Sequence, residues 1–151
     1  MTKLQAAALC LVLTGCSSAA GPDSAVPSKA AELFAARTAY LGDNPRVSSL
    51  VSKVVAGSVG SYTLELQTAR PPLGLTVNIG RPVTPSLKTD FSKDATLLLG
   101  LIGNVDEVTF AAGRETHTFT ATSASKTAGF DVKKLGKDQQ VLADYLRKTA
   151  D

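Results

Sequence analysis

The stretch "SYTLELQTARPPLGLTVNI", residues 61–79, decides the fold class of this chain. Apolar and polar residues alternate on both sides of Arg70-Pro71-Pro72. This two-residue period is typical of a β-strand with one buried face. The prolines lie in the connection, where they remove no ladder hydrogen bond. The stretch therefore predicts two antiparallel strands, at 61–67 and 75–79. Their apolar positions are Tyr62, Leu64, Leu66, Leu75, Val77 and Ile79.

Helices and a second pair of strands surround this hairpin. Before it, Val47, Leu50, Val51 and Val54 recur at helical spacing behind Asn44-Pro45, which suits a helix start. The other expected elements are a helix at 29–40, a buried helix at 95–103, strands at 105–111 and 115–122, and a terminal helix at 138–148. Two hairpins separated by a helix predict an α+β fold, an antiparallel four-stranded sheet packed by helices on one face.

The amino terminus carries the signature of an exported, lipid-anchored protein. Lys3 precedes the apolar run "LQAAALCLVL", whose ten residues would reach only about 15 Å as a helix, too short to cross a bilayer. The run ends Leu13-Thr14-Gly15-Cys16, which resembles the lipobox of bacterial lipoproteins. We expect residues 1–15 to be a signal peptide and Cys16 to carry a diacylglyceryl group. Residues 16–28 then form a tether to a single domain over 29–151.

Composition and charge exclude several partners and chemistries. The 16 Lys and Arg residues stand against 13 Asp and Glu and are spread along the chain, so no basic stripe suits nucleic acid. Cys10 would leave with the signal peptide and Cys16 would be acylated, which leaves no thiol for a metal or a nucleophile. We expect no metal or cofactor. The expected partners are membrane lipid, through Cys16, and an unknown protein, peptide or glycan ligand.

No constellation of residues identifies a catalytic centre. His117 is the only histidine and has neither a second metal ligand nor an acidic partner at a recognisable spacing, which favours a semi-buried structural role. Asp90 and Asp94 could form a carboxylate pair, but charge at a helix start explains them better. Asp43-Asn44 is likewise better explained as a helix cap than as a cation site.

The polar face of the expected sheet is the candidate binding surface. Short hydroxyl and amide side chains at regular spacing can hydrogen-bond a glycan or an extended peptide. The candidate residues are Thr63, Glu65, Gln67, Thr76, Asn78 and Thr118, and we expect Thr116 and Thr120 beside them. The same pattern describes the solvated side of an antiparallel sheet. Both interpretations stay open.

Three segments resemble an uncharacterised family. They are "YLGDNPRVSSLV", "YTLELQTARPPLGLTVNI" and "LLLGLIGNVDEVTF", within residues 38–148. The family is a domain of unknown function found in lipoproteins and membrane-anchored extracellular proteins, mainly of Gram-positive bacteria. Its signatures are matched by Tyr40, Gly42, Asn44, Val47, Asn104, Val105 and Asp106. Leu73 stands where the family would place an aromatic residue, so no shared aromatic site carries over.

The resemblance implies an extracytoplasmic sensing or binding role, because some relatives join this domain to membrane sensors of the antibiotic-responsive metallopeptidase type. We therefore expect a binding or sensory module for an envelope ligand or partner protein, lipid-anchored on the cell membrane and facing outside the cytoplasm. The alternative is an envelope hydrolase whose active site carries no recognisable motif. The family contributes no catalytic residues.

Overall fold

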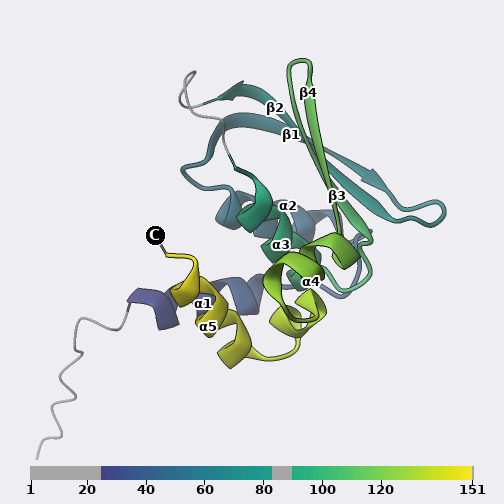
Figure 1. The fold of residues 1–151 in the computed structure, drawn as a ribbon. Helices are drawn as coiled ribbons and strands as arrows, with labels where there is room; N and C mark the ends of the chain where they lie inside the picture. The colour runs from purple at the N-terminus through teal and green to yellow at the C-terminus, as the bar shows by residue number, and fades with distance from the viewer. Residues whose placement is uncertain (1–24, 83–89, 151) are drawn as a thin grey trace, which may run out of the picture.

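The computed structural model describes residues 25–82 and 90–150, and these form a four-stranded sheet with helices packed on one side (Figure 1). The elements in chain order are α1 (Ala25–Ala36), α2 (Asn44–Val54), β1 (Val59–Gln67), β2 (Gly74–Pro82), α3 (Ser92–Leu101), β3 (Glu107–Ala112), β4 (Glu115–Thr120), α4 (Ala121–Ala128), the 3₁₀ turn η2 (Val132–Gly136) and α5 (Gln139–Lys148). The expected signal peptide, Cys16 and the expected tether up to residue 24 lie outside the described residues.

The sheet is mixed, which corrects the expectation of a purely antiparallel sheet. Its order is β1-β2-β3-β4, and the two hairpins β1/β2 and β3/β4 are antiparallel as predicted. The central pair β2/β3 is parallel. Because α3 lies between these two strands in the chain, the connection is long enough to return to the same end of the sheet. The two hairpins are therefore joined through a strand-helix-strand unit.

The apolar residues that alternate along the strands lie on one face of the sheet, and this face packs against the core. Leu75, Val77, Val108 and Phe110 are buried, and Phe110 stacks on Phe91 with ring centroids 4.5 Å apart. Tyr62, Leu64 and Leu66 on β1 are partly buried against the same core. The helices lie on this side of the sheet in Figure 1.

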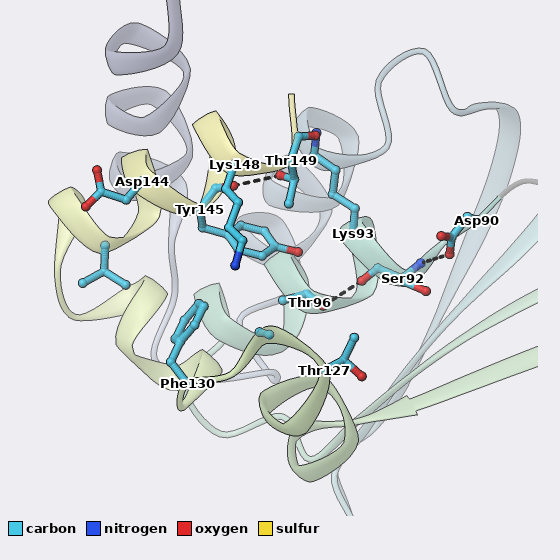
Figure 2. Close-up of a pocket in the computed structure, with 12 residues that line it drawn as sticks. Asp90, Ser92, Lys93, Thr96, Thr127, Phe130, Asp144, Tyr145, Lys148 and Thr149 are labelled. Carbon is cyan, nitrogen blue, oxygen red and sulfur yellow. Dashed lines mark hydrogen bonds between the residues drawn. The ribbon is translucent and has the colours of Figure 1, made fainter. Parts of the chain in front are cut away.

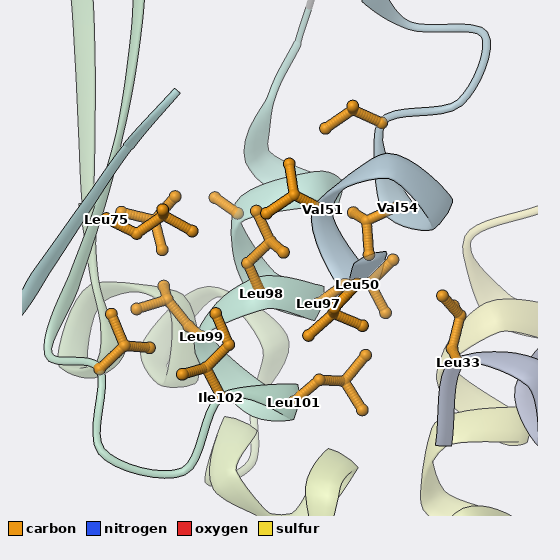
Figure 3. Close-up of a cluster of buried hydrophobic side chains, with 14 of the residues drawn as sticks. Leu33, Leu50, Val51, Val54, Leu75, Leu97, Leu98, Leu99, Leu101 and Ile102 are labelled. Carbon is orange, nitrogen blue, oxygen red and sulfur yellow. The ribbon is translucent and has the colours of Figure 1, made fainter. Parts of the chain in front are cut away.

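Helix α3 is the centre of the core. The run from Asp94 to Leu101 is buried, which confirms the buried helix predicted from "ATLLLGLIG", although α3 ends at Leu101 rather than at residue 103. Figure 3 shows Leu98 and Leu99 between Leu75 of the sheet and the apolar face of α2. Gly100 lets η2 approach, since a Cβ there would lie 2.5 Å from the carbonyl oxygen of Val132. Among the described residues, no helix is long and apolar enough to span a membrane.

Helix α1 differs from the predicted 29–40 at both ends. It begins at Ala25, within the segment assigned to the tether, and ends at Ala36. The chain then extends, because the amide of Thr38 donates to the carbonyl of Leu101 and the amide of Gly103 donates to the carbonyl of Thr38. This bridge anchors the end of α1 to the end of α3, so the helix cannot continue to Tyr40.

The start of α2 and the end of β4 also differ from the predictions. The cap of α2 is Asp43, whose carboxylate accepts from the amide of Arg46, and Asn44 is the first helical residue. The strand expected at 115–122 ends at Thr120, where α4 begins. Thr120 and Ser123 form a reciprocal capping box, and Gly129 ends the helix with a left-handed φ of 79°. Helix α4 was not predicted.

Candidate functional site

The six residues proposed as a polar binding face share one face of the sheet. The register pairs Thr63 with Asn78 and Glu65 with Thr76, and Gln67 lies opposite Gly74. Strand β3 continues the face through Thr109, which is aligned with Thr76 and Thr118 on its two sides. Thr116 and Thr120 follow on β4 with the same parity. The structure therefore brings the predicted residues together on the side away from the core.

This polar face is shallow. Its side chains bond to one another: the Asn78 amide donates to Glu65 Oε1 at 2.9 Å, and the hydroxyl oxygens of Thr109 and Thr118 lie 2.9 Å apart. A small hollow of about 210 Å³ takes in Thr63 and Asn78 near the start of β1. The geometry suits contact with an extended surface rather than enclosure of a small molecule.

The other residues singled out from the sequence lie apart from this face. His117 is exposed on the edge strand β4, with 51% of its side-chain surface accessible, rather than semi-buried as expected; its Nε2 lies 3.9 Å from Glu115 Oε2. Asp90 accepts from the amide of Ser92, the first residue of α3, at 2.9 Å, so its charge lies at the helix start as expected. Within residues 25–82 and 90–150, no three His, Cys, Asp or Glu side chains cluster as metal ligands would.

A larger site lies between α3, the end of α4 and α5. It is a half-open pocket of about 550 Å³ (Figure 2). Ligand pockets in proteins commonly measure about 300–1,000 Å³ and combine an apolar lining with a few polar groups. The lining residues are Asp90, Ser92, Lys93, Thr96, Thr127, Ala128, Phe130, Val141, Asp144, Tyr145, Lys148 and Thr149.

The apolar wall of the pocket follows from the sequence of α5. Leu142 and Leu146 are buried in the core, whereas Val141 and Tyr145, one helical turn apart, are only partly buried. The Phe130 and Tyr145 rings meet edge to face with centroids 6.1 Å apart. These two aromatic rings and Val141 leave a concave apolar surface that no other described side chain fills.

Hydrogen bonds hold the polar part of the lining in place. The Lys93 ammonium donates to the carbonyl of Thr149 and so ties the first turn of α3 to the end of α5. The Thr96 hydroxyl donates to the carbonyl of Ser92 at 2.7 Å. Burial raises the pKa of the Tyr145 phenol, and the carboxylates of Asp94 and Asp90 act in the same direction. Tyr145 is therefore a neutral hydrogen-bonding group at neutral pH.

Asp94 is a buried carboxyl in the first turn of α3, next in sequence to the pocket-lining Lys93. Burial raises its pKa to about 6, and its hydrogen bond with Ser58 opposes the rise. Lys93 and Asp90 also act on it electrostatically, in opposite directions. A carboxyl group with this pKa changes its charge near neutral pH, where an ordinary aspartate stays ionised.

The sequence did not predict the pocket, although two signals were present. The apolar stripe of the terminal helix is broader than a narrow packing seam, and Phe130 precedes it without an assigned partner. The capping residues Thr120 and Ser123 and the glycine at 129 mark α4, whose last two residues close the pocket. Without α4, the third wall of the pocket could not be placed.

Comparison with known proteins identifies the family. The family described as "Domain of unknown function (DUF4825)" matches residues 33–126, more than half of the chain. The chain belongs to this family. No curated protein and no solved structure matches the chain significantly.

Four of the residues that carry the DUF4825 resemblance hold the scaffold. Asn104 Oδ1 accepts from the amide of Leu41 at 2.6 Å, and Asp106 Oδ2 accepts from the amide of Leu73 at 2.7 Å. Val47 and Val105 are fully buried. These contacts join the α1–α2 loop and the β1–β2 connection to the segment before β3. They explain why the fold needs these four residues.

The pocket extends beyond the matched DUF4825 region. Asp90, Ser92, Lys93 and Thr96 lie inside residues 33–126. The lining residues from Thr127 onward, including Tyr145, lie after the end of the match. One wall of the pocket thus comes from the family domain and the other from the C-terminal segment of this chain.

Proposed function

We propose that this protein is a lipoprotein held at the cell membrane through acylated Cys16 and facing outside the cytoplasm. Its folded domain acts there as a binding or sensory module, and a small ligand occupies the pocket between α3, α4 and α5. The lipobox Leu13-Thr14-Gly15-Cys16 supports the anchoring. The pocket of about 550 Å³ carries the binding part of the proposal.

Complementation of a deletion strain tests the pocket. Ala128 lines the pocket at the end of α4, and Ala128→Phe would fill it with a ring. Thr122→Phe is the matched control, because Thr122 is exposed on the same helix and does not line the pocket. We expect Ala128→Phe to accumulate normally and to fail in complementation, while Thr122→Phe restores the wild-type phenotype. Full complementation by Ala128→Phe would refute the pocket as the functional site.

Mass spectrometry of protein from the membrane fraction tests the anchor. We expect the mature chain to begin at Cys16 and to carry a diacylglyceryl group, because charge, run length and the Leu-Thr-Gly-Cys ending agree. Cys16→Ala should release the protein from the membrane fraction. An unmodified Cys16, or mature chain that retains earlier residues, would contradict the anchoring.

The polar sheet face is a second candidate surface, for a protein, peptide or glycan partner. The observation that favours it is the alignment of Thr63, Glu65, Gln67, Thr76, Asn78 and Thr118 on one outward face. The triple variant Gln67→Ala, Asn78→Ala, Thr118→Ala should retain the melting temperature and lose function if this face binds the partner. Full complementation by the triple variant would show that this face is exposed to solvent and binds no partner that the function needs.

An envelope hydrolase remains the alternative function. A catalytic role would need an acid, base or nucleophile at the pocket with a partner in reach. Tyr145 and the neighbouring Asp94 are the titratable groups nearest to that description. The apolar lining favours binding over hydrolysis.

A further inference from the structure

The charged side chains that line the pocket differ in their hydrogen-bond and ion-pair partners. Asp144 accepts from the Arg147 guanidinium at 2.9 Å and from the side-chain Nε2 of Gln140 at 3.0 Å, and its carboxylate points away from the pocket in Figure 2. Asp90 accepts hydrogen bonds from Ser92, which lower its pKa. Each acidic group at the pocket thus already has a donor.

Lys148 differs from these groups, because its ammonium has no hydrogen bond or ion pair within the described residues. It lines the pocket from the last turn of α5. In Figure 2 its side chain runs past the Tyr145 ring in this view. The Lys93 ammonium on the opposite wall donates to the carbonyl of Thr149, and its charge also acts on the Asp94 carboxyl. Two cations therefore border an apolar cavity.

We infer that the pocket takes an amphipathic anion, a molecule with an apolar body and one carboxylate or similar anionic group. This inference rests on the proposed function and names the class of its ligand. The apolar body would pack between Phe130, Val141 and Tyr145, where burial of apolar surface drives binding. The anionic group would lie at Lys148, with Lys93 contributing from the other wall. Charge-assisted hydrogen bonds to the ammonium then select the anion.

Three matched amphiphiles test the ligand class: decanoate, decanol and decyltrimethylammonium, each below its micelle-forming concentration. They are titrated by calorimetry into the mature chain from residue 16, with Cys16→Ser so that no lipid is attached. We expect decanoate to bind at least about fivefold more tightly than decanol, and decyltrimethylammonium to bind most weakly. Equal affinity for decanoate and decyltrimethylammonium would overturn the inference.

Charge removal at Lys148 tests its role. Lys148→Gln should weaken decanoate binding about fivefold and leave decanol binding unchanged. Lys134→Gln is the matched control, since Lys134 is exposed on η2 and does not line the pocket. Lys148→Glu should reverse the preference toward decyltrimethylammonium. Equal effects of Lys148→Gln and Lys134→Gln on decanoate would refute a local contact at Lys148.

The pocket-filling variant separates failure of this inference from failure of the proposed function. If all three amphiphiles bind equally and Ala128→Phe abolishes the binding, the pocket binds ligands but does not select anions, and only the inference fails. If no amphiphile binds, or if Ala128→Phe leaves the affinities unchanged, the pocket is not the ligand site and the proposed function fails as well. Thermal melts of each variant report whether the fold is retained.

Discussion

Asp94 shows how one buried side chain couples stability to pH. Its pKa of about 6 lies above the ordinary 3.8, so the folded protein keeps a proton that the unfolded chain has already released. Stability therefore falls as the pH rises from 4 to 6, and the full cost is present at pH 7. This rise of the Asp94 pKa corresponds to a loss of about 3 kcal/mol at most in the free energy of unfolding at pH 7.

Asp94→Asn removes this cost, because the amide is similar in shape and carries no charge. We expect the free energy of unfolding at pH 7 to rise by about 1–3 kcal/mol relative to wild type, and the difference to shrink toward zero at pH 4. Urea denaturation of both proteins between pH 4 and pH 7 measures the difference. The account would be contradicted if the difference in unfolding free energy stayed constant from pH 4 to pH 7, or if the variant were less stable at pH 7. Either result would show that Asp94 is ionised in the folded protein and that its carboxylate is either well solvated or paired.

Lys133 is a second residue whose role is structural. Its ammonium donates to three carbonyls in the last turn of α3 and in the segment that follows it: Leu99 at 2.8 Å, Ile102 at 3.0 Å and Val105 at 2.6 Å. Leu99 needs this donor, because the amide of Gly103 donates to Thr38 instead of continuing the helix. Burial lowers the pKa of Lys133. The lysine thus caps a helix from a distant segment.

Lys133→Met keeps the aliphatic stem and removes the donor. Because three carbonyls lose their charged partner, we expect a loss of about 3 kcal/mol in unfolding free energy by urea denaturation. Lys134→Met, at an exposed neighbour, should change it by less than about 0.5 kcal/mol. Similar values for the two variants would mean that water replaces the ammonium without cost.

At the scale of elements, the contact between α3 and η2 depends on the absence of a side chain. A Cβ at Gly100 would lie 2.5 Å from the carbonyl oxygen of Val132 and 2.8 Å from Leu135 Cβ. We expect Gly100→Ala to destabilise the protein by about 1–3 kcal/mol, although alanine favours helices. Gly42→Ala is the control, because nothing lies within 4 Å of a Cβ there. If both variants melt at the wild-type temperature, the two backbones are not in close contact.

The residue pattern within each strand and helix determined whether that element could be predicted from the sequence. The strands of both hairpins were predictable because Leu64, Leu75, Val77 and Phe110 alternate with polar neighbours on a half-buried sheet. The direction of β3 relative to β2 was not, because alternation is the same for parallel and antiparallel pairs. Helix α4 was missed because its sequence, ATSASKTA, has few large apolar residues, and Ala124 is its only buried residue.

At the scale of the whole molecule, the two candidate surfaces lie on different parts of the fold. The polar face follows directly from strand alternation, so the sequence predicted its members correctly as neighbours. The pocket needs three elements that are distant in the chain, α3, α4 and α5, and local patterns say nothing about how these pack. This is why the sequence did not predict that Phe130 and Tyr145 form an aromatic pair.

Amide chemical-shift mapping decides between these two surfaces and tests the central claim that the pocket is the ligand site. The mature chain with Cys16→Ser is labelled with nitrogen-15 and titrated with decanoate. The proposal predicts saturable shifts concentrated at Thr96, Thr127, Phe130, Tyr145 and Lys148, with little change on the polar face. Shifts concentrated at Thr63, Thr76 and Thr118, or no saturable shifts at the pocket, would contradict it.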